Sequence, residues 1–359
     1  MSTQSALSEK TGLPLDAGML DGLSDPVFLV DPSHVIVDYN RAAQQLLGED
    51  ALSVRLDELL DSEDIIGAID ATLAGTPGTR SEVFLPHPIG RYYELNIWRL
   101  PDLKSPGPAW AMLVLRDITE SKKAAQMRAD FVANVSHELR SPLSSLLGFI
   151  ETLRGPARDD RKASDRFLEI METEAKRMTR LINELLALSK VETDEHIRPE
   201  KLVNLGPILV QVANILLVGA DERGMKIVVE TPDDLPLVLG DADELIQVFQ
   251  NLVSNAIHYG RAKTAIDVRL GHGQMPETGK PGVSVSVTNI GEGIPAEDIP
   301  RLTERFYRVD KGRSRSMGGT GLGLAIVKHI IARHRGDLEI ESVPGNETTF
   351  TVSLPAVNS

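Results

Sequence analysis

A histidine is followed directly by an acid in the stretch FVANVSHELRSPLSSLLGF, at 131–149. Val135 and Leu139 belong to an apolar stripe with helical spacing, and His137 lies about 200° around the helix from each of them. We therefore expect the imidazole of His137 to face solvent, where it can act as a nucleophile. The carboxylate of Glu138 could orient the ring and accept its proton. Taken alone, such a pair is more often an ordinary surface pair.

Pro142 follows inside the same helical pattern. It cannot donate a hydrogen bond to the carbonyl of Glu138, and its ring crowds that carbonyl. We expect a bend just beyond His137, which would suit a switch.

A second set of residues, near the C-terminus, could bind a nucleotide. The chain has no G-x-x-x-x-G-K-[ST] sequence, so P-loop chemistry is excluded. In DELIQVFQNLVSNAIHYG, at 243–260, Asn251 and Asn255 are four residues apart and share one face of a helix. Their two carboxamide oxygens could hold a hydrated Mg²⁺ that carries phosphates. Taken alone, the pair is better explained by a solvated helix face.

Two glycine-rich blocks follow these asparagines. VSVSVTNIGEGIP, at 283–295, is an alternating strand whose terminal glycines permit close backbone approach to a flat ligand. GGTGLGLAIVKHIIARH, at 318–334, leads into an apolar helix whose first N–H groups would attract phosphate oxygens. The glycines concerned are Gly291, Gly293, Gly319, Gly321 and Gly323. Each block alone could be a turn, and the second lacks the preceding strand of a Rossmann fingerprint.

The composition of the 359 residues limits the classes of function and fold. A chain of this length predicts two or three domains. The net charge of −14 argues against nucleic-acid binding and against binding to an anionic membrane surface. The absence of cysteine excludes disulfides, thiolate metal sites and cysteine nucleophiles.

The first segment predicts an α+β module with an antiparallel sheet, after a loose leader at 1–15. Strand-like runs alternate with polar turns over 16–119. The expected strands are 26–31, 34–40, 81–86, 91–100 and 109–118, and short helices are expected at 41–48 and 61–75.

The middle segment, 120–195, predicts two long helices separated by a break at 155–160. Apolar residues recur at spacings of three and four, from Met127 to Leu153 and from Phe167 to Leu188. Such a hairpin has too little core to stand alone, so two copies should pair as a four-helix bundle in a homodimer.

The last segment, 196–359, predicts an α/β domain. Its expected strands are 226–230, 265–270, 283–289, 337–342 and 348–354, its expected helices are 205–223, 241–258 and 322–334, and 271–282 is expected to be a turn-rich loop.

The N-terminus shows no basic region followed by an apolar run, and no window approaches an uninterrupted membrane span. We expect a cytoplasmic protein without a signal peptide or direct membrane anchor.

The segment around His137 resembles the dimerisation and phosphotransfer helix of histidine kinases. The family core His-Glu-Leu-Arg-Thr-Pro stands here as residues 137–142, with Ser141 in place of the usual threonine. The resemblance implies that His137 is the phosphoacceptor, with Glu138 and Ser141 as catalytic neighbours. Ser141 keeps the hydroxyl that helps the family to dephosphorylate its partner.

The C-terminal blocks resemble the N, G1, F and G2 boxes of the ATP-binding domain shared by histidine kinases, DNA gyrase, Hsp90 chaperones and MutL proteins. The resemblance implies ATP and Mg²⁺ as cofactors, with Asn255 and Asn251 as metal ligands and Tyr259 near the adenine. It makes Tyr307 to Gly318 a mobile lid. The remaining residues assigned to the nucleotide are His258, Asn289, Gly291, Gly293, Phe306, Arg308, Lys311, Arg313, Arg315, Gly319, Thr320, Gly321, Leu322 and Gly323.

Three positions affect what this ATP site should do. Asn251 stands where the ATPase branches carry a glutamate that activates water, and an amide cannot act as that base. Asn289 replaces the aspartate that normally binds the adenine amino group, so nucleotide binding should weaken by roughly 1–2 kcal/mol. His258 replaces a common lysine.

Residues 16–119 are similar to a PAS domain, with Asp31, Asn40 and the sequence Asp117-Ile118-Thr119 as landmarks. Neither His34 nor His87 lies where a haem ligand would be expected, so we favour a filled apolar core that senses by protein contact. A small ligand stays possible.

These resemblances predict a sensor histidine kinase that phosphorylates its own histidine and passes the phosphoryl group to an aspartate on a response regulator receiver domain. Within the family, SPLSSLLGFIETL and LTERFYRVD are most similar to the phosphate-regulon sensors. Two alternatives are a pseudokinase that acts as a scaffold or phosphatase, because of Asn289, and a gyrase-like ATPase, which Asn251 disfavours.

Overall fold

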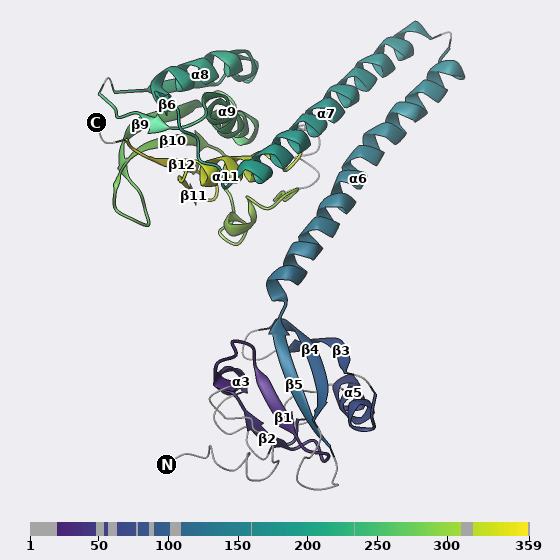
Figure 1. Cartoon of the computed structure of the whole chain (residues 1–359). Helices are drawn as coiled ribbons and strands as arrows, with labels where there is room; N and C mark the ends of the chain where they lie inside the picture. Colours follow the sequence, from purple (N-terminus) through teal and green to yellow (C-terminus); the bar gives the residue numbers. More distant parts are fainter. Residues whose placement is uncertain are drawn as a thin grey trace. The chain divides into compact units, whose positions relative to one another are not determined.

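The computed structural model describes residues 20–47, 54–56, 63–76, 78–85, 90–100, 109–158, 160–232, 234–309 and 319–357. The chain divides into two compact units, Met1–Val132 and Ala133–Ser359 (Figure 1). None of the helices in these ranges is both long enough and apolar enough to cross a membrane.

The first unit is built on a five-stranded antiparallel sheet in the order β2-β1-β5-β4-β3. Its strands are β1 (Val27–Val30), β2 (Ile36–Tyr39), β3 (Thr79–Leu85), β4 (Arg91–Leu100) and β5 (Trp110–Asp117), and its helices include α3 (Arg41–Leu47) and α5 (Glu63–Leu73). Alternating side chains such as Leu95 and Ile97 pack with Ile65 and Ile69 of α5 in one apolar core. The five predicted strands and both helices are confirmed.

Two of the predicted PAS landmarks hold the chain where elements meet. The buried carboxamide of Asn40 accepts hydrogen bonds from the N–H groups of Val27 (2.9 Å) and Ala43 (3.0 Å). The carboxylate of Asp117 accepts one from Thr119 N–H (2.9 Å), at the start of α6, and pairs with Arg91 (2.8 Å). Because Asn40 is buried, its carboxamide provides these N–H groups with the hydrogen bonds that water would otherwise supply.

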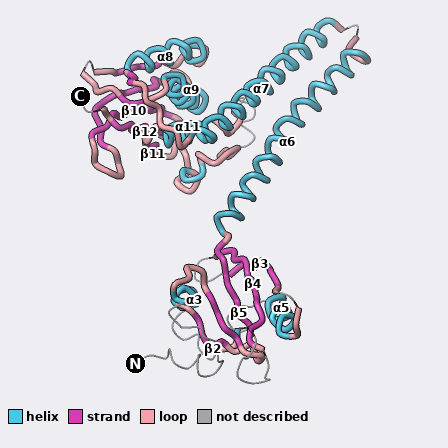
Figure 2. Tube along the Cα trace, in the orientation of Figure 1, coloured by secondary structure: helices cyan, strands magenta, loops and turns pink. Residues whose placement is uncertain are grey.

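The hairpin consists of α6 (Thr119–Arg154) and α7 (Arg161–Asp194), which Figure 2 shows as two long helices joined by a short turn. The Asp160 side chain caps α7 by accepting a hydrogen bond from Ala163 N–H. Near the turn, the rings of Phe149 and Phe167 stack with centroids 5.3 Å apart. The break predicted at 155–160 is confirmed, and α6 continues through Pro142 without interruption.

Much of the predicted apolar stripe of the hairpin is not covered within one chain. Met127 is 60% exposed and Leu143 is 49% exposed, and both belong to the stripe that pairing of two hairpins was predicted to bury. The hairpin also exposes Leu147, Ile150, Leu168, Ile182 and Leu186. This exposure is consistent with the prediction that a single hairpin has too little core to stand alone, and the pairing of two copies stays a prediction.

The C-terminal part of the second unit is an α/β sandwich. A five-stranded sheet in the order β11-β12-β10-β9-β7 carries α8 (Leu205–Asp221), α9 (Ala242–Tyr259) and α11 (Gly323–Arg333). The strands are β7 (Lys226–Glu230), β9 (Ala265–Gln274), β10 (Pro281–Ile290), β11 (Asp337–Ser342) and β12 (Glu347–Pro355). Every second residue of β10 and β12, including Val285 and Val352, is buried beneath the helices.

Two sequence expectations for the sandwich need correction. Residues 271–282 are not one loop, because β9 and β10 extend into it and pair as far as Gln274 and Pro281. A small second sheet of β6 (Leu202–Val203) and β8 (Val238–Leu239) was missed, since a run of two residues is too short to show a strand period.

His334 joins the end of α11 to the start of α9. It has no exposed surface. Its Nδ1 donates to the carbonyl of Ile330 (2.8 Å), so its Nε2 is the acceptor for the N–H of Asp241 (3.0 Å). Burial lowers the pKa of His334 below its usual value near 6.5, and the charge of Arg333 acts in the same direction.

This lowered pKa predicts that acid destabilises the sandwich. The unfolded chain binds more protons at His334 than the folded chain does, so stability is lost as the pH falls through about 6.5. Urea-dependent pulse proteolysis of the second unit, between about pH 7.5 and pH 5.5, should show this loss. The loss should be smaller in His334→Gln and unchanged in the control His272→Gln, on the exposed surface of β9. An equal pH dependence in all three proteins would exclude His334 as the cause.

Candidate functional site

The predicted phosphoacceptor lies on the exposed surface of α6. His137 and Ser141 are one helical turn apart, and both are exposed in the single chain. The predicted orientation of His137 toward solvent is therefore confirmed for one protomer.

Glu138 is held by arginines on two other elements. Its Oε2 lies 2.8 Å from Arg177 of α7 and 3.6 Å from Arg308, which comes two residues after Phe306. We expected Glu138 to orient the imidazole of His137, and that role stays a prediction. Sequence reasoning missed Arg177, because nothing in a sequence shows which residue of a second helix faces position 138.

The three nucleotide-binding blocks are brought together at one end of the sandwich. Asn251, on α9, donates to the carbonyl of Gly323, at the start of α11 (3.3 Å). Gly260, which ends α9, forms a β-bridge with Gly291. Residues that are more than 30 apart along the chain thus become neighbours, as the order of the blocks predicted.

The glycines of these blocks are required by the backbone itself. A Cβ on Gly293, whose φ is 71°, would lie 2.6 Å from Cα of Pro344. A Cβ on Gly321, whose φ is 76°, would lie 2.9 Å from Cα of Phe306. The glycines are therefore required by the close approach of the protein's own backbone, and the close approach of a ligand at these positions stays a prediction.

The F box is connected to the last glycine block. Phe306 has a positive φ of 63°, which is strained for a residue with a side chain, and its N–H donates to the carbonyl of Gly321 (2.8 Å). Backbone strain of this kind is concentrated at functional sites. The next residue, Tyr307, donates to Asp298 and lies under the guanidinium of Arg301, 4.2 Å from the ring centroid.

Four other predicted residues occupy distinct positions around this end of the sandwich. Tyr259 is 49% exposed at the end of α9, whereas Asn289 is 5% exposed on β10. His258 turns back along its own helix, with Nδ1 2.6 Å from the carbonyl of Ser254. Leu322 is fully buried, so only its backbone can face a ligand. Lys311, Arg313, Arg315 and Gly318 lie outside the described residues.

Asn251 and the start of α11 suit a metal ion that is held mainly by nucleotide phosphates better than a metal ion that is held only by protein ligands. In the described part of the chain, no three His, Asp or Glu side chains converge on one point. Asn251 uses its Nδ2 for Gly323, which leaves carbonyl oxygen as the metal-binding atom of its side chain. The first turn of α11 has no side-chain cap, so its N–H groups suit phosphate oxygens.

Acidic residues of the hairpin contact the sandwich at four places, which we call the hairpin contact. Its pairs are Glu138 with Arg308, Glu184 with Thr320, Glu192 with Arg305 (2.7 Å), and Glu195 with His329 (2.9 Å). The sequence gives no signal for these pairs, because they depend on how two elements pack. Two of the sandwich residues, Arg308 and Thr320, were predicted to contact the nucleotide.

Glu184 is the most enclosed acid of the hairpin contact. Burial raises the pKa of the Glu184 carboxyl, while the Thr320 hydroxyl and the charges of Arg180 and Arg308 act in the opposite direction. The Thr320 hydroxyl donates a hydrogen bond to this carboxyl, and it also accepts one from the N–H of Leu322 (3.3 Å). Thr320 therefore links α7 to the start of α11.

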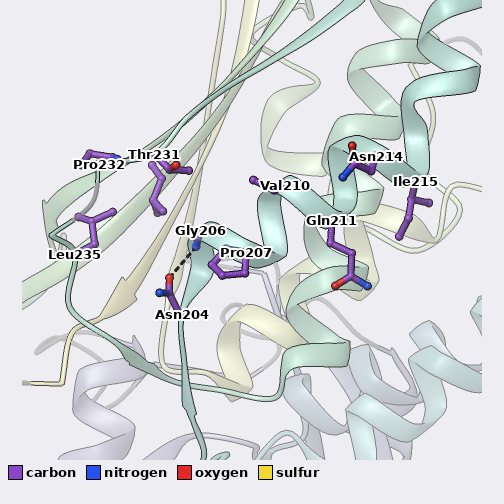
Figure 3. A pocket seen from close by; sticks show the side chains of 11 residues that line it. Asn204, Gly206, Pro207, Val210, Gln211, Asn214, Ile215, Thr231, Pro232 and Leu235 are labelled. Atoms are coloured by element: carbon purple, nitrogen blue, oxygen red, sulfur yellow. Dashed lines mark hydrogen bonds between the residues drawn. The ribbon is translucent and has the colours of Figure 1, made fainter.

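A separate cavity of about 790 Å³ lies between α8 and the segment after β7 (Figure 3). Its walls include Asn204, Val210, Gln211, Ile215 and Thr231, and none of its lining side chains carries a charge. Without a cationic side chain to pair with phosphates, this cavity is a poor match for a nucleoside triphosphate.

Comparisons with known proteins give one consistent result. Residues 240–358 match the histidine kinase-, DNA gyrase B- and HSP90-like ATPase family, residues 127–194 match the His Kinase A (phospho-acceptor) domain, and residues 20–123 match the PAS fold. The chain is 35% identical to the phosphate regulon sensor protein PhoR of Pseudomonas aeruginosa, over 92% of this chain and 71% of PhoR.

Two other similar proteins match this chain less completely, one over part of its own length and one in fold alone. The sensor histidine kinase WalK of Bacillus subtilis is 37% identical over 67% of this chain, which spans 39% of WalK. The crystal structure of the histidine kinase ThkA in complex with the response regulator protein TrrA aligns with a TM-score of 0.50 and 23% identity, over 92% of this chain and 96% of that chain.

The structure predicts different effects for two nearby glycines. Gly293→Ala places a Cβ against Pro344, whereas a Cβ on Gly345, at a φ of 80°, meets open space. Gly345→Ala should cost only the conformational penalty, about 1–2 kcal/mol, and Gly293→Ala should cost more and weaken ATP binding. Thermal unfolding and ATP titration of both variants would test this, and equal losses in the two would contradict it.

Proposed function

Because this chain belongs to the family of sensor histidine kinases, we propose that it transfers the γ-phosphoryl group of ATP to His137 and then to an aspartate of a response regulator. The observation that carries this proposal is the ion pair between Glu138 and Arg308. It brings the ATP-binding sandwich to the residue beside an exposed imidazole.

In the proposed reaction, the residues of the sandwich hold the nucleotide and those of α6 receive the phosphoryl group. Asn255 and Asn251 would bind Mg²⁺, and the start of α11 would bind phosphate oxygens. When bound, ATP supplies the phosphoryl group and Mg²⁺ neutralises part of the phosphate charge. One imidazole nitrogen of His137 would attack the γ-phosphorus as the bond from that phosphorus to the departing ADP breaks, while Glu138 would accept the proton of the other nitrogen.

Nucleotide binding and the hairpin contact should compete for the same donors. Arg308 and Thr320 contact the carboxylates of Glu138 and Glu184, and both would also contact phosphate oxygens. Phosphates that draw Arg308 away would leave Glu138 in contact with Arg177 of the hairpin. Loading of ATP would thereby release the sandwich from the residue beside His137.

The exposed apolar side chains of the hairpin support a homodimer. Leu147, Ile182 and Leu186 are exposed on long helices, where contiguous apolar surface is unfavourable in water. Pairing of two hairpins into a four-helix bundle would cover them. We also propose that the response regulator binds the hairpin near His137, because the phosphoryl group must reach its aspartate.

Asn289 keeps one alternative open, a pseudokinase that acts as a scaffold or phosphatase. The carboxamide can accept the adenine hydrogen bond but lacks the usual negative charge. If calorimetry showed no ATP binding at millimolar concentrations, the alternative would be favoured. A gyrase-like ATPase would instead turn over ATP steadily without labelling the protein.

Incubation with radiolabelled ATP and Mg²⁺ should give an acid-labile label on the full-length chain, because phosphohistidine is hydrolysed in acid. His137→Ala should lose this label, and His196→Ala, which removes another exposed histidine just after α7, should keep it. A label that persists in His137→Ala would contradict the assignment of the phosphoacceptor.

A further inference from the structure

We propose that Arg177 is a positioning residue, which acts through Glu138 to prepare His137 for phosphorylation. This inference rests on the proposed function, in which Glu138 accepts a proton from His137. Arg177 lies outside the short segment around His137 and outside the ATP-binding blocks, and it comes from the opposite helix of the hairpin, 39 residues from Glu138.

The contact has the geometry of a strong ion pair. Arg177 donates from its terminal nitrogen to Oε2 of Glu138 at 2.8 Å, and both side chains are 15% exposed. A charge-assisted hydrogen bond at this distance, shielded from water, fixes both partners more firmly than an exposed pair does. The exposed pair of Lys176 with Glu172, one position along α7, provides the contrast.

A purely structural role explains the pair less well. Removing two charges from water has a desolvation cost, and an apolar pair often stabilises such a position equally well. The hairpin is held near its turn by the stacked rings of Phe149 and Phe167. The guanidinium of Arg177 lies 3.8 Å from Glu174 of its own helix, but its shorter contact, at 2.8 Å, is with the acid that adjoins the phosphoacceptor.

Arg177 and Arg308 differ in what they can do for Glu138. Both contact Oε2, but Arg308 belongs to the sandwich and is also a candidate for binding phosphate. Arg177 lies on the same hairpin as Glu138, so its contact persists when Arg308 moves to a nucleotide. It can therefore hold the carboxylate in one orientation during the transfer, when the N–P bond forms, the bond from the γ-phosphorus to ADP breaks, and the His137 proton passes to Glu138.

A double-mutant cycle on the full-length chain separates action through Glu138 from an independent effect. The variants are Arg177→Gln, Glu138→Gln, the double variant and Arg177→Lys, with Lys176→Gln as the matched control. The readouts are kcat and KM for ATP in autophosphorylation, with circular dichroism to compare helix content.

We expect Arg177→Gln to lower kcat by about 10–100-fold, with KM for ATP within about twofold of the original value. The double variant should be no slower than Glu138→Gln. Arg177→Lys should recover part of the rate, because an ammonium keeps the charge without the planar guanidinium. Lys176→Gln should keep the original rate.

The inference is overturned if the losses in Arg177→Gln and Glu138→Gln multiply, or if Arg177→Gln keeps the original kcat. If Glu138→Gln keeps the original kcat, the inference is overturned too, because Arg177 is proposed to act through Glu138. The proposed kinase function is a separate claim, and it stands as long as His137 is still labelled in that variant, at any rate. If Arg177→Gln loses helix content, its rate cannot be interpreted and the rate of Arg177→Lys is used instead. An Arg177→Lys variant that keeps the original helix content but is no faster than Arg177→Gln overturns the inference.

Discussion

Carboxylates of the hairpin bind donors that the phosphates of a nucleotide would also need. Glu138 contacts Arg308, and Glu184 accepts the hydroxyl of Thr320, while both donors belong to the ATP-binding sandwich. The Thr320 hydroxyl has one proton with which to donate a hydrogen bond, so it has to exchange partners before it donates to phosphate, and the charge of Arg308 would be shared between carboxylate and phosphate. This competition connects the state of the helix that carries His137 with the state of the site that holds ATP.

Both donors lie in loops of the sandwich, next to ordered elements. Thr320 precedes α11, whose buried face packs in the sandwich, and Arg308 follows Phe306, whose backbone is bonded to Gly321. The carboxylates stand on two long helices. Rigid helices present these charges at fixed positions, so a small displacement of the sandwich changes several contacts at once.

Local sequence patterns predicted the elements but not the contacts between them. Helical spacing identified α6, α7 and the exposure of His137, and alternation identified all ten long strands, because both signals are contained within a short window. The positive φ of Gly293 and Gly321 agrees with the requirement for glycine. The partners of Glu138 and Glu184 lie 39 and 136 residues away, and no local pattern specifies which side chains meet over such separations.

The affinity of the full-length chain for ATP in Glu184→Ala, measured by calorimetry, tests the competition most directly. Loss of this carboxyl frees the Thr320 hydroxyl without changing any residue of the sandwich. The account predicts tighter ATP binding, by at least about threefold, and no change in the control Glu172→Ala, at an exposed ion pair of the same helix. Unchanged or weaker ATP binding in Glu184→Ala would contradict it.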